Sequence, residues 1–268
     1  LDPATLEARE IDGGKYVAAV VKQKGRPTPE VLVDALPKLV ESIKFEKSMR
    51  WLPASRRAGN DLGATFSRPI RWYVALLGDM VIPFEYAGVT SGNISRGLRP
   101  YGSPDVTIPS ADKYFDVIRE AGILLDKEER KASIVEQVNQ AAALLGGQAI
   151  IEEGLLNEVT NLIEMPTAVM GGFNSEFLAL PRDVLISVMK KHQRYFPVES
   201  QKSKVESQTF DLRPSTLLPN FIAIRNGDDI HIDTVREGNE HVLGARFADA
   251  NFFVREDVKL KLEDYRPK

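Results

Sequence analysis

The chain has 268 residues, enough for one large domain or two modest ones with a substantial buried core. Lys and Arg number 35 and Asp and Glu number 38, so the net charge of -3 excludes a uniformly basic nucleic-acid-binding domain. The absence of cysteine excludes disulfides, thiolate metal sites and cysteine nucleophiles. Its apolar runs fall short of the ~20 residues that a membrane helix needs, so we expect no membrane partner.

The chain starts with LDPATLEARE, which has no Met and no signal-peptide pattern, so we interpret the sequence as part of a longer protein. We expect a partial N-terminal subdomain over residues 1–60, made of a strand and helices. A core of mixed strands and helices follows over residues 61–258, and residues 259–268 begin a linker or a further domain.

The first predicted elements are a β-branched strand over residues 13–25 and a helix over residues 28–43, kinked or split at Pro37. Two apolar runs flank Gly78 and Asp79 and predict a hairpin. A short strand is expected over residues 93–99.

The middle of the chain is mainly helical by pattern. A helix follows Ser110, and another starts at Asp126, where Glu129 has the spacing of a capping-box partner. Apolar residues at helical spacing over residues 152–166 indicate one buried stripe, which includes Leu162. A buried strand over residues 167–173 follows.

The last third contains a helix that opens on Pro181 and runs to residue 192, and then a strand over residues 193–199. Residues 200–216 are polar and aperiodic, which predicts a flexible loop. A strand over residues 220–227 precedes a long helix, whose start is placed by the capping-box spacing of Thr234 and Glu237. Strands and helices mix without strict alternation, so the expected class is α+β with mixed or antiparallel sheets and packed helices.

The sequence lacks the common catalytic motifs. The histidines at positions 192, 231 and 241 form no pair with metal-ligand spacing. Neither a phosphate-binding G-x-x-x-x-G-K-[ST] loop nor a G-x-G-x-x-G fingerprint occurs, and the G-x-S-x-G spacing of a hydrolase is also missing. We therefore expect no catalytic residue, no metal and no cofactor in this chain.

Four arginines flank the predicted hairpin and the strand after it, at Arg68, Arg71, Arg96 and Arg99. Guanidinium groups bind phosphate through two nitrogens and stack on bases, so this group could position RNA. The alternative is structural: these arginines could pair at sheet edges with Glu85 or with backbone carbonyls.

A second basic group lies at the end of the helix that opens on Pro181. We predict that Lys190, Lys191 and Arg194 form a rim that binds phosphate, and that Tyr195 could stack a base. Asp183 is the one nearby acid in sequence, while residues 133–181 hold six acids and no Lys or Arg. The alternative is an ordinary helix end, where the helix dipole favours cations by about 0.3–1 kcal/mol.

Six ordered segments carry a resemblance to the β chain of bacterial-type glycyl-tRNA synthetase, over at least residues 44–257. They are FEKSMRW, FSRPIRWYVALLGDMVIPFEYAGV, LLNEVTNLIEMPTAVMGGF, LPRDVLISVMKKHQRYFPV, LLPNFIAIRNG and REGNEHVLGARFADANFFVRED. The chain reads RGLRP where bacterial members tend to read R-G-H-R-F. This difference resembles the plant organellar form, in which the α and β chains are fused.

The resemblance implies a non-catalytic tRNA-binding and architectural module in the N-terminal half of the β chain. Its expected fold is similar to the editing-type domain of the phenylalanyl-tRNA synthetase β chain. The implied partners are tRNA-Gly and the α chain, or a fused α region, which would bind ATP and Mg. The implied location is a plastid stroma or mitochondrial matrix for a plant source, and otherwise the bacterial cytoplasm.

Two other functions stay open at this point. An aminoacyl-tRNA hydrolase would need a pocket with a positioned water or nucleophile, and the sequence marks neither. A pure subunit-assembly module would dock the catalytic region without touching RNA, and the acidic, apolar-striped residues 133–181 favour that role for one face.

Overall fold

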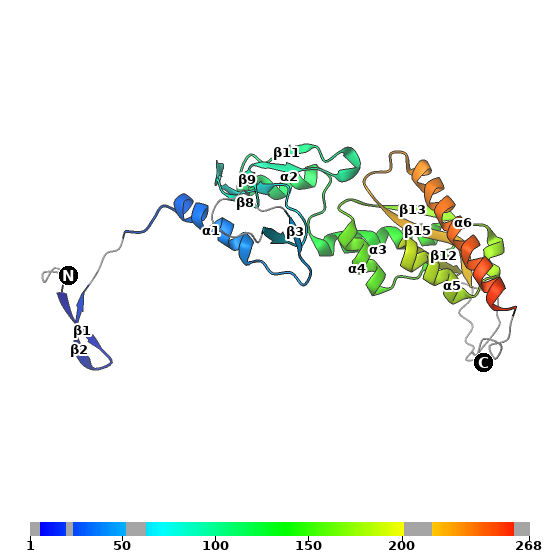
Figure 1. Ribbon diagram of the computed structural model, residues 1–268, viewed down its shortest axis with the longest axis horizontal. Helices are drawn as coiled ribbons and strands as arrows, with labels where there is room; N and C mark the ends of the chain where they lie inside the picture. The colour runs from blue at the N-terminus through cyan, green and yellow to red at the C-terminus, as the bar shows by residue number, and fades with distance from the viewer. Residues whose placement is uncertain (1–5, 20–23, 52–62, 201–215, 260–268) are drawn as a thin grey trace. The chain divides into compact units, whose positions relative to one another are not determined.

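The computed structural model describes residues 6–19, 24–51, 63–200 and 216–259 (Figure 1). The chain divides into two compact units, one of residues 1–95 with 109–111 and the other of residues 96–108 with 112–268. The loop predicted over residues 200–216 falls almost entirely outside the described residues. The domain boundary near residue 60 also falls outside them, so both stay predictions.

The first unit begins with an antiparallel hairpin of β1 (Leu6–Ile11) and β2 (Gly14–Ala19). Asp12 and Gly13 join the strands with φ values of 52° and 79°, and two positive φ values are what a two-residue hairpin turn requires. The predicted strand is confirmed at β2, whereas β1 was not predicted. Every residue of β1 is exposed, so no apolar periodicity marks this strand.

Helix α1 (Thr28–Ser42) and short strands complete the first unit, and Pro37 lies inside the helix without splitting it. Gly78 and Asp79 join β6 to β7 as predicted, with Leu77 paired to Met80. Strand β9 pairs with β5 in parallel and with β8 in antiparallel fashion. The strands are β3 (Met49–Trp51), β4 (Ala64–Phe66), β5 (Tyr73–Val74), β6 (Leu76–Leu77), β7 (Met80–Val81), β8 (Glu85–Tyr86) and β9 (Val89–Gly92).

The second unit is built around an antiparallel sheet with the strand order β12-β14-β15-β13. These strands are β12 (Gly147–Ala149), β13 (Pro166–Gly172), β14 (Phe196–Ser200) and β15 (Leu217–Asn226). The helices are α2 (Tyr114–Glu120), α3 (Lys127–Leu144), α4 (Glu153–Leu162), α5 (Arg182–Ser187) and α6 (Ile232–Asp257). Two further strands, β10 (Ile94–Arg96) and β11 (Asp105–Thr107), precede the sheet in the chain.

Helices cover both faces of this sheet (Figure 1). On one face, Ile134 and Val138 of α3 and Leu156 of α4 pack with Phe196 and Ile222. On the other face, α5, α6 and the segment between α5 and β14 enclose a second cluster, which includes Leu185, Met189, Tyr195, Phe221, Leu243 and Phe247. The second unit is therefore a layer of strands between two layers of helices, and the predicted mixture of antiparallel strands and packed helices is confirmed.

Side chains from both helical layers reach the open edge of strand β13. The amide of Gln137 in α3 donates to the Pro166 carbonyl at 3.0 Å and accepts from the Ala168 N–H at 2.9 Å. A carboxylate oxygen of Glu240 in α6 accepts from the Gly172 N–H at 2.8 Å. Because edge strands expose unpaired backbone groups, these contacts take the place of a missing neighbour strand.

Helix starts agree with the sequence in one case and differ in another. Asp126 caps α3 by accepting from the Glu129 N–H at 2.8 Å, as its position predicts, but the Glu129 carboxylate binds Arg119. The start predicted from Thr234 and Glu237 is wrong. Helix α6 begins at Ile232, after His231 in the left-handed region, and no side chain caps it.

Candidate functional site

The basic group predicted around residue 190 lies at an irregular helix end. Helix α5 stops at Ser187, and a π-helix (Val188–Gln193) continues it, where the sequence predicts one regular helix. Arg194 closes the π-helix with φ 58° and ψ 37°, and its N–H donates to the Lys190 carbonyl at 3.1 Å. The next N–H, of Tyr195, donates to the Met189 carbonyl at 3.0 Å. These contacts satisfy carbonyls that a helix end otherwise leaves open.

Two of the three cations at this corner are ion-paired with carboxylates from the acidic part of the chain. Lys190 pairs with Glu152, and Arg194 Nε donates to Glu158 Oε1 at 2.6 Å. The expectation that only Asp183 lies near this corner is therefore wrong. The acidic residues are distant in sequence, but α4 and the residue before it bring them to the basic group. Lys191 is exposed and has no ion-pair partner among the described residues.

Tyr195 is part of the core and not of the surface. Only 6% of the residue is exposed, and its ring stacks on Phe221 with centroids 4.5 Å apart and planes at 13°. Burial raises the pKa of its hydroxyl to about 12. The prediction that Tyr195 could stack a base is wrong, because the face of its ring is already occupied.

The other predicted arginines separate into paired and unpaired residues. Arg96 pairs with Asp105, so the structural alternative holds for it, with a different acid from the one expected. Arg68, Arg71 and Arg99 are exposed and carry no ion pair within the described parts of the chain. Arg68 and Arg71 belong to the first unit, while Arg96 and Arg99 belong to the second.

Trp72 adds an aromatic surface beside Arg71 in the sequence. Its exposed fraction is 41%. Exposed guanidinium and aromatic groups are the side chains that contact unpaired RNA bases. The segment from Arg68 to Trp72 thus keeps the chemistry that the sequence assigns to this basic group.

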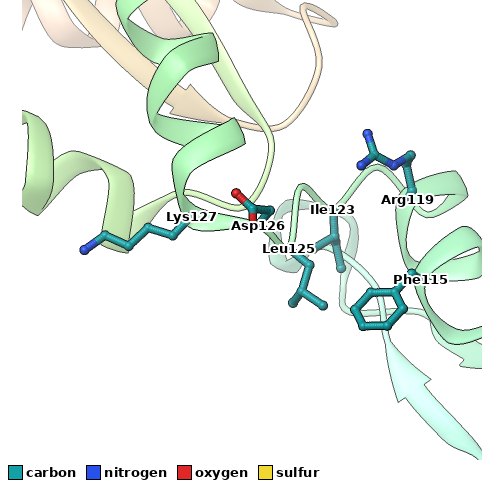
Figure 2. Close-up of a pocket in the computed structure, with 6 residues that line it drawn as sticks. All are labelled: Phe115, Arg119, Ile123, Leu125, Asp126 and Lys127. Carbon is teal, nitrogen blue, oxygen red and sulfur yellow. The ribbon is translucent and has the colours of Figure 1, made fainter.

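The second unit also contains a groove between α2 and α3 that the sequence did not reveal (Figure 2). Its volume is about 440 Å³, and it is lined by Phe115, Arg119, Ile123, Leu125, Asp126 and Lys127. Phe115 is 69% exposed, so an aromatic ring stands at the surface here. A lone exposed Phe in a short helix gives no periodic signal, which is why pattern analysis missed it.

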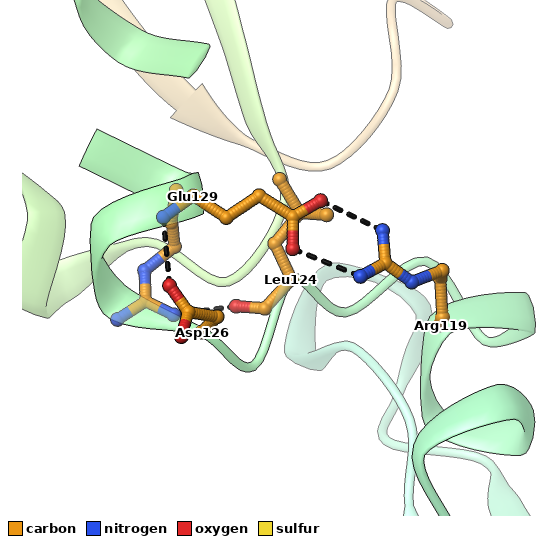
Figure 3. Close-up of polar contacts among 5 residues, drawn as sticks. Arg119, Leu124, Asp126 and Glu129 are labelled. Atoms are coloured by element: carbon orange, nitrogen blue, oxygen red, sulfur yellow. Dashed lines mark hydrogen bonds and ion pairs between the residues drawn. The ribbon is translucent and has the colours of Figure 1, made fainter. Parts of the chain in front are cut away.

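An ion pair fixes one side of this groove (Figure 3). Arg119 donates to the two carboxylate oxygens of Glu129 at 2.7 and 2.9 Å. The hydrogen bond from Arg119 holds the pKa of Glu129 below its usual value. Arg130 donates to the Leu124 carbonyl at 2.5 Å and to the Thr160 carbonyl at 2.9 Å, which ties the start of α3 to the neighbouring loop and to α4.

A smaller pocket of about 110 Å³ adjoins Arg194. Most of its lining is aliphatic and comes from α4, the residue after it, and β15: Val159, Leu162, Ile163, Ala223 and Ile224, with Gln193, Arg194 and Tyr195.

The described residues contain no cluster of three potential metal ligands. No helix in those parts of the chain is long and apolar enough to cross a membrane. The fold defines a mixed α/β protein built on an antiparallel sheet.

Comparison with known proteins gives the family. Residues 1–268 match a family model described as glycyl-tRNA synthetase beta subunit. The glycine–tRNA ligase beta subunit of Clostridioides difficile (strain 630) is 43% identical over 265 residues, covering 99% of this chain and 36% of that protein. The beta subunit of Geobacter sulfurreducens is 41% identical over 263 residues, covering 98% of this chain and 35% of that protein. The chain belongs to the glycyl-tRNA synthetase beta subunit family.

A plant relative matches almost as well. The chloroplastic/mitochondrial glycine–tRNA ligase 2 of Arabidopsis thaliana is 40% identical over 259 residues, covering 96% of this chain and 22% of that protein. The family that the six sequence segments indicate is thus confirmed, and the relatives include a plant organellar enzyme. The chain spans about a third of the length of the bacterial relatives it matches, at 34–36%.

Proposed function

We propose that this chain is a tRNA-binding and architectural module of a glycyl-tRNA synthetase, supporting the ATP-dependent attachment of glycine to tRNA-Gly. The observation that carries the proposal is the match of the whole chain to the beta subunit family. In this proposal the partners are tRNA-Gly and the α chain, or an α region of the same polypeptide. That catalytic region binds ATP and Mg. The location is the bacterial cytoplasm, or the plastid stroma or mitochondrial matrix for a plant protein.

Among the predicted RNA-contacting cations, we assign the phosphate contacts to those without an acidic partner among the described residues. These are Arg68, Arg71, Arg99 and Lys191. Arg96, Lys190 and Arg194 already pair with carboxylates, so RNA would have to displace an acid to reach them. A free cation releases counterions from RNA without that cost, and counterion release supplies much of the affinity for nucleic acid.

The test is salt-dependent binding of tRNA-Gly by the full-length enzyme with Arg68→Gln and Arg71→Gln combined. Binding should weaken, and the slope of log affinity against log salt should flatten by about 0.7–0.9 for each phosphate that the variant no longer neutralises. Glycine-dependent pyrophosphate exchange should stay at the parent level, because these residues lie outside the proposed catalytic region.

The matched control combines Arg96→Gln with Lys190→Gln, which removes the same charge from cations that are already paired. We expect a smaller change of slope in this control. If the parent and the folded double variant of Arg68 and Arg71 gave equal slopes, these arginines would not contact the phosphates of the tRNA.

A second candidate role is assembly, favoured by the groove between α2 and α3. Phe115 and Leu125 stand exposed beside each other at a groove of about 440 Å³, and exposed apolar surface of this kind marks interaction sites. If assembly is the role, Phe115→Ser should lower retention of the α chain while tRNA binding persists.

We also propose that the chain has the fold of an editing-type domain. It would serve for binding, because a pocket for glycine can exclude larger amino acids by size alone.

A further inference from the structure

Arg194 occupies a backbone position that favours glycine. Its φ of 58° lies in the left-handed region, and the residue that closes a helix in this conformation is usually Gly. A bulky residue held there against its backbone preference is a starting point for a functional hypothesis. The side chain, and not the turn, then explains the choice of arginine.

The guanidinium of Arg194 is held at one edge. Nε donates to Glu158 Oε1 at 2.6 Å, and a guanidinium is planar, so this bond orients the whole group. Among the described residues, neither terminal nitrogen of Arg194 donates a further hydrogen bond, and Glu158 Oε2 accepts none. The pair is half exposed, with 45% of the Arg194 side chain and 49% of the Glu158 side chain accessible to solvent. It therefore offers a fixed cation and a fixed anion side by side.

An apolar pocket adjoins this pair because two neighbouring strands differ in length. Strand β15 runs to Asn226, but β14 begins at Phe196, whose partner on β15 is Ile222. Beyond that point Ala223 and Ile224 have no β14 residue beside them, and they contribute to the pocket lining together with Val159 and Leu162 of α4. Leu162 is 57% exposed although the sequence pattern assigns it to the buried stripe.

The size and lining of the pocket restrict what can bind. A volume of about 110 Å³ leaves room for a short branched aliphatic chain. The terminal nitrogens of an arginine match the two oxygens of a carboxylate. A carboxylate such as Glu158 in turn accepts hydrogen bonds from an ammonium group.

We infer that the Arg194–Glu158 pair and the adjoining pocket bind a free aliphatic α-amino acid of about the size of valine. Its carboxylate binds the terminal nitrogens of Arg194, its ammonium binds Glu158, and its side chain enters the pocket. The pair carries no net charge, which suits a zwitterion better than a phosphate. This site goes beyond the proposed contact with tRNA, and it involves none of the cations assigned to phosphate binding.

Equilibrium dialysis of the full-length enzyme with labelled L-valine tests the inference. We expect binding to weaken by about ten-fold or more in Arg194→Gly, since this variant cannot form the charged hydrogen bonds to the carboxylate. Glycine suits the backbone at position 194, so this variant should melt no lower than the parent. Glu158→Gln should also weaken binding, because the ammonium loses its anion, whereas the neighbouring Lys191→Gln should bind valine as the parent does.

Ligand analogues separate the two polar contacts. Valinamide lacks the carboxylate and isovalerate lacks the ammonium, so both should bind more weakly than valine. Equal binding of valine by the parent and by a folded Arg194→Gly variant would overturn the inference. So would displacement of valine by inorganic phosphate at equal concentration, which would show an anion site only. Loss of tRNA binding in the Arg68 and Arg71 variant would leave these results unaffected, so the two proposals fail separately.

Discussion

At Arg194 the backbone and the side chain favour different amino acids. The left-handed conformation costs a residue with a Cβ about 1–2 kcal/mol relative to glycine. The exposed ion pair with Glu158 returns only part of that, because surface pairs contribute about 0–1 kcal/mol. Stability alone would therefore select glycine here.

This conflict predicts an unusual order of stability among variants. Arg194→Gly should be more stable than Arg194→Ala by about 1 kcal/mol, because only glycine relieves the backbone. Urea unfolding measures both free energies. The control is Arg236 in the regular helix α6, where the alanine variant should instead be more stable than the glycine variant by about 1 kcal/mol. If the alanine variant were the more stable one at both positions, residue 194 would not be strained.

Tyr195 predicts a loss of stability at high pH. Burial raises the pKa of its hydroxyl to about 12, whereas an unfolded tyrosine has a pKa of about 10. Below pH 10 the hydroxyl is protonated in both states and has no effect. Between about pH 10 and 12 only the unfolded chain ionises, so the free energy of unfolding falls by at most about 1.4 kcal/mol per pH unit. Tyr195→Phe should be less sensitive over this range, as measured by urea unfolding at each pH, and an unchanged sensitivity would contradict the burial.

At the scale of elements, the edge of β13 depends on a helix side chain. The Gln137 amide makes two hydrogen bonds with the strand backbone, as a neighbouring strand would. Gln137→Ala should lower the free energy of unfolding by about 1–3 kcal/mol, because it leaves partly buried backbone groups of β13 without partners. It should also increase self-association, since an open edge can pair with another chain. Urea unfolding and light scattering measure the two effects.

Gln140 provides the control for this prediction. It lies on the same helix, but among the described residues its exposed amide forms a hydrogen bond only with Glu136, at 3.1 Å. Gln140→Ala should therefore change the unfolding free energy by less than about 0.5 kcal/mol and leave the protein monodisperse to the same degree. A similar loss of stability in both variants would assign the effect to helix α3 and not to the strand edge.

Local signals predicted the elements well where one residue type decides the backbone. Asp126 marks the start of α3, and Gly78 with Asp79 marks the β6–β7 turn. These predictions succeed because a cap or a turn depends on a few consecutive residues. The π-helix at Val188–Gln193 was not predicted, since its sequence differs in no local feature from an ordinary helix end.

Predictions that depended on long-range contacts were less successful. Alternation along a strand places Tyr195 and Phe196 on opposite faces of the sheet, but it cannot show which face is exposed to solvent, and here helices cover both faces. The charges around Lys190 were mispredicted for a related reason. The partners of Lys190 and Arg194 come from helix α4 and from the residue before it, and sequence distance does not reveal that Glu152 and Glu158 lie beside them.

For the whole molecule, the assignment as a non-catalytic module predicts no activation of glycine by the purified chain. The sequence holds no phosphate-binding glycine loop, and the described residues hold no cluster of potential metal ligands. Pyrophosphate exchange with glycine and ATP should therefore equal the rate without protein. The full-length enzyme is the positive control, and exchange above background by the purified chain would refute the assignment.

The strand order of the second unit has a consequence for synthesis on the ribosome. Strands β12 and β13 emerge early, but β12 pairs only with β14 and β13 pairs only with β15, the last strand made within the described residues. Until residue 226 has left the ribosome, β13 has no strand partner, and the nascent chain exposes one face of α3 and α4. Folding of this unit should therefore occur late and in one step, and a chain truncated before Leu217 should bind chaperones and be cleaved readily by proteases.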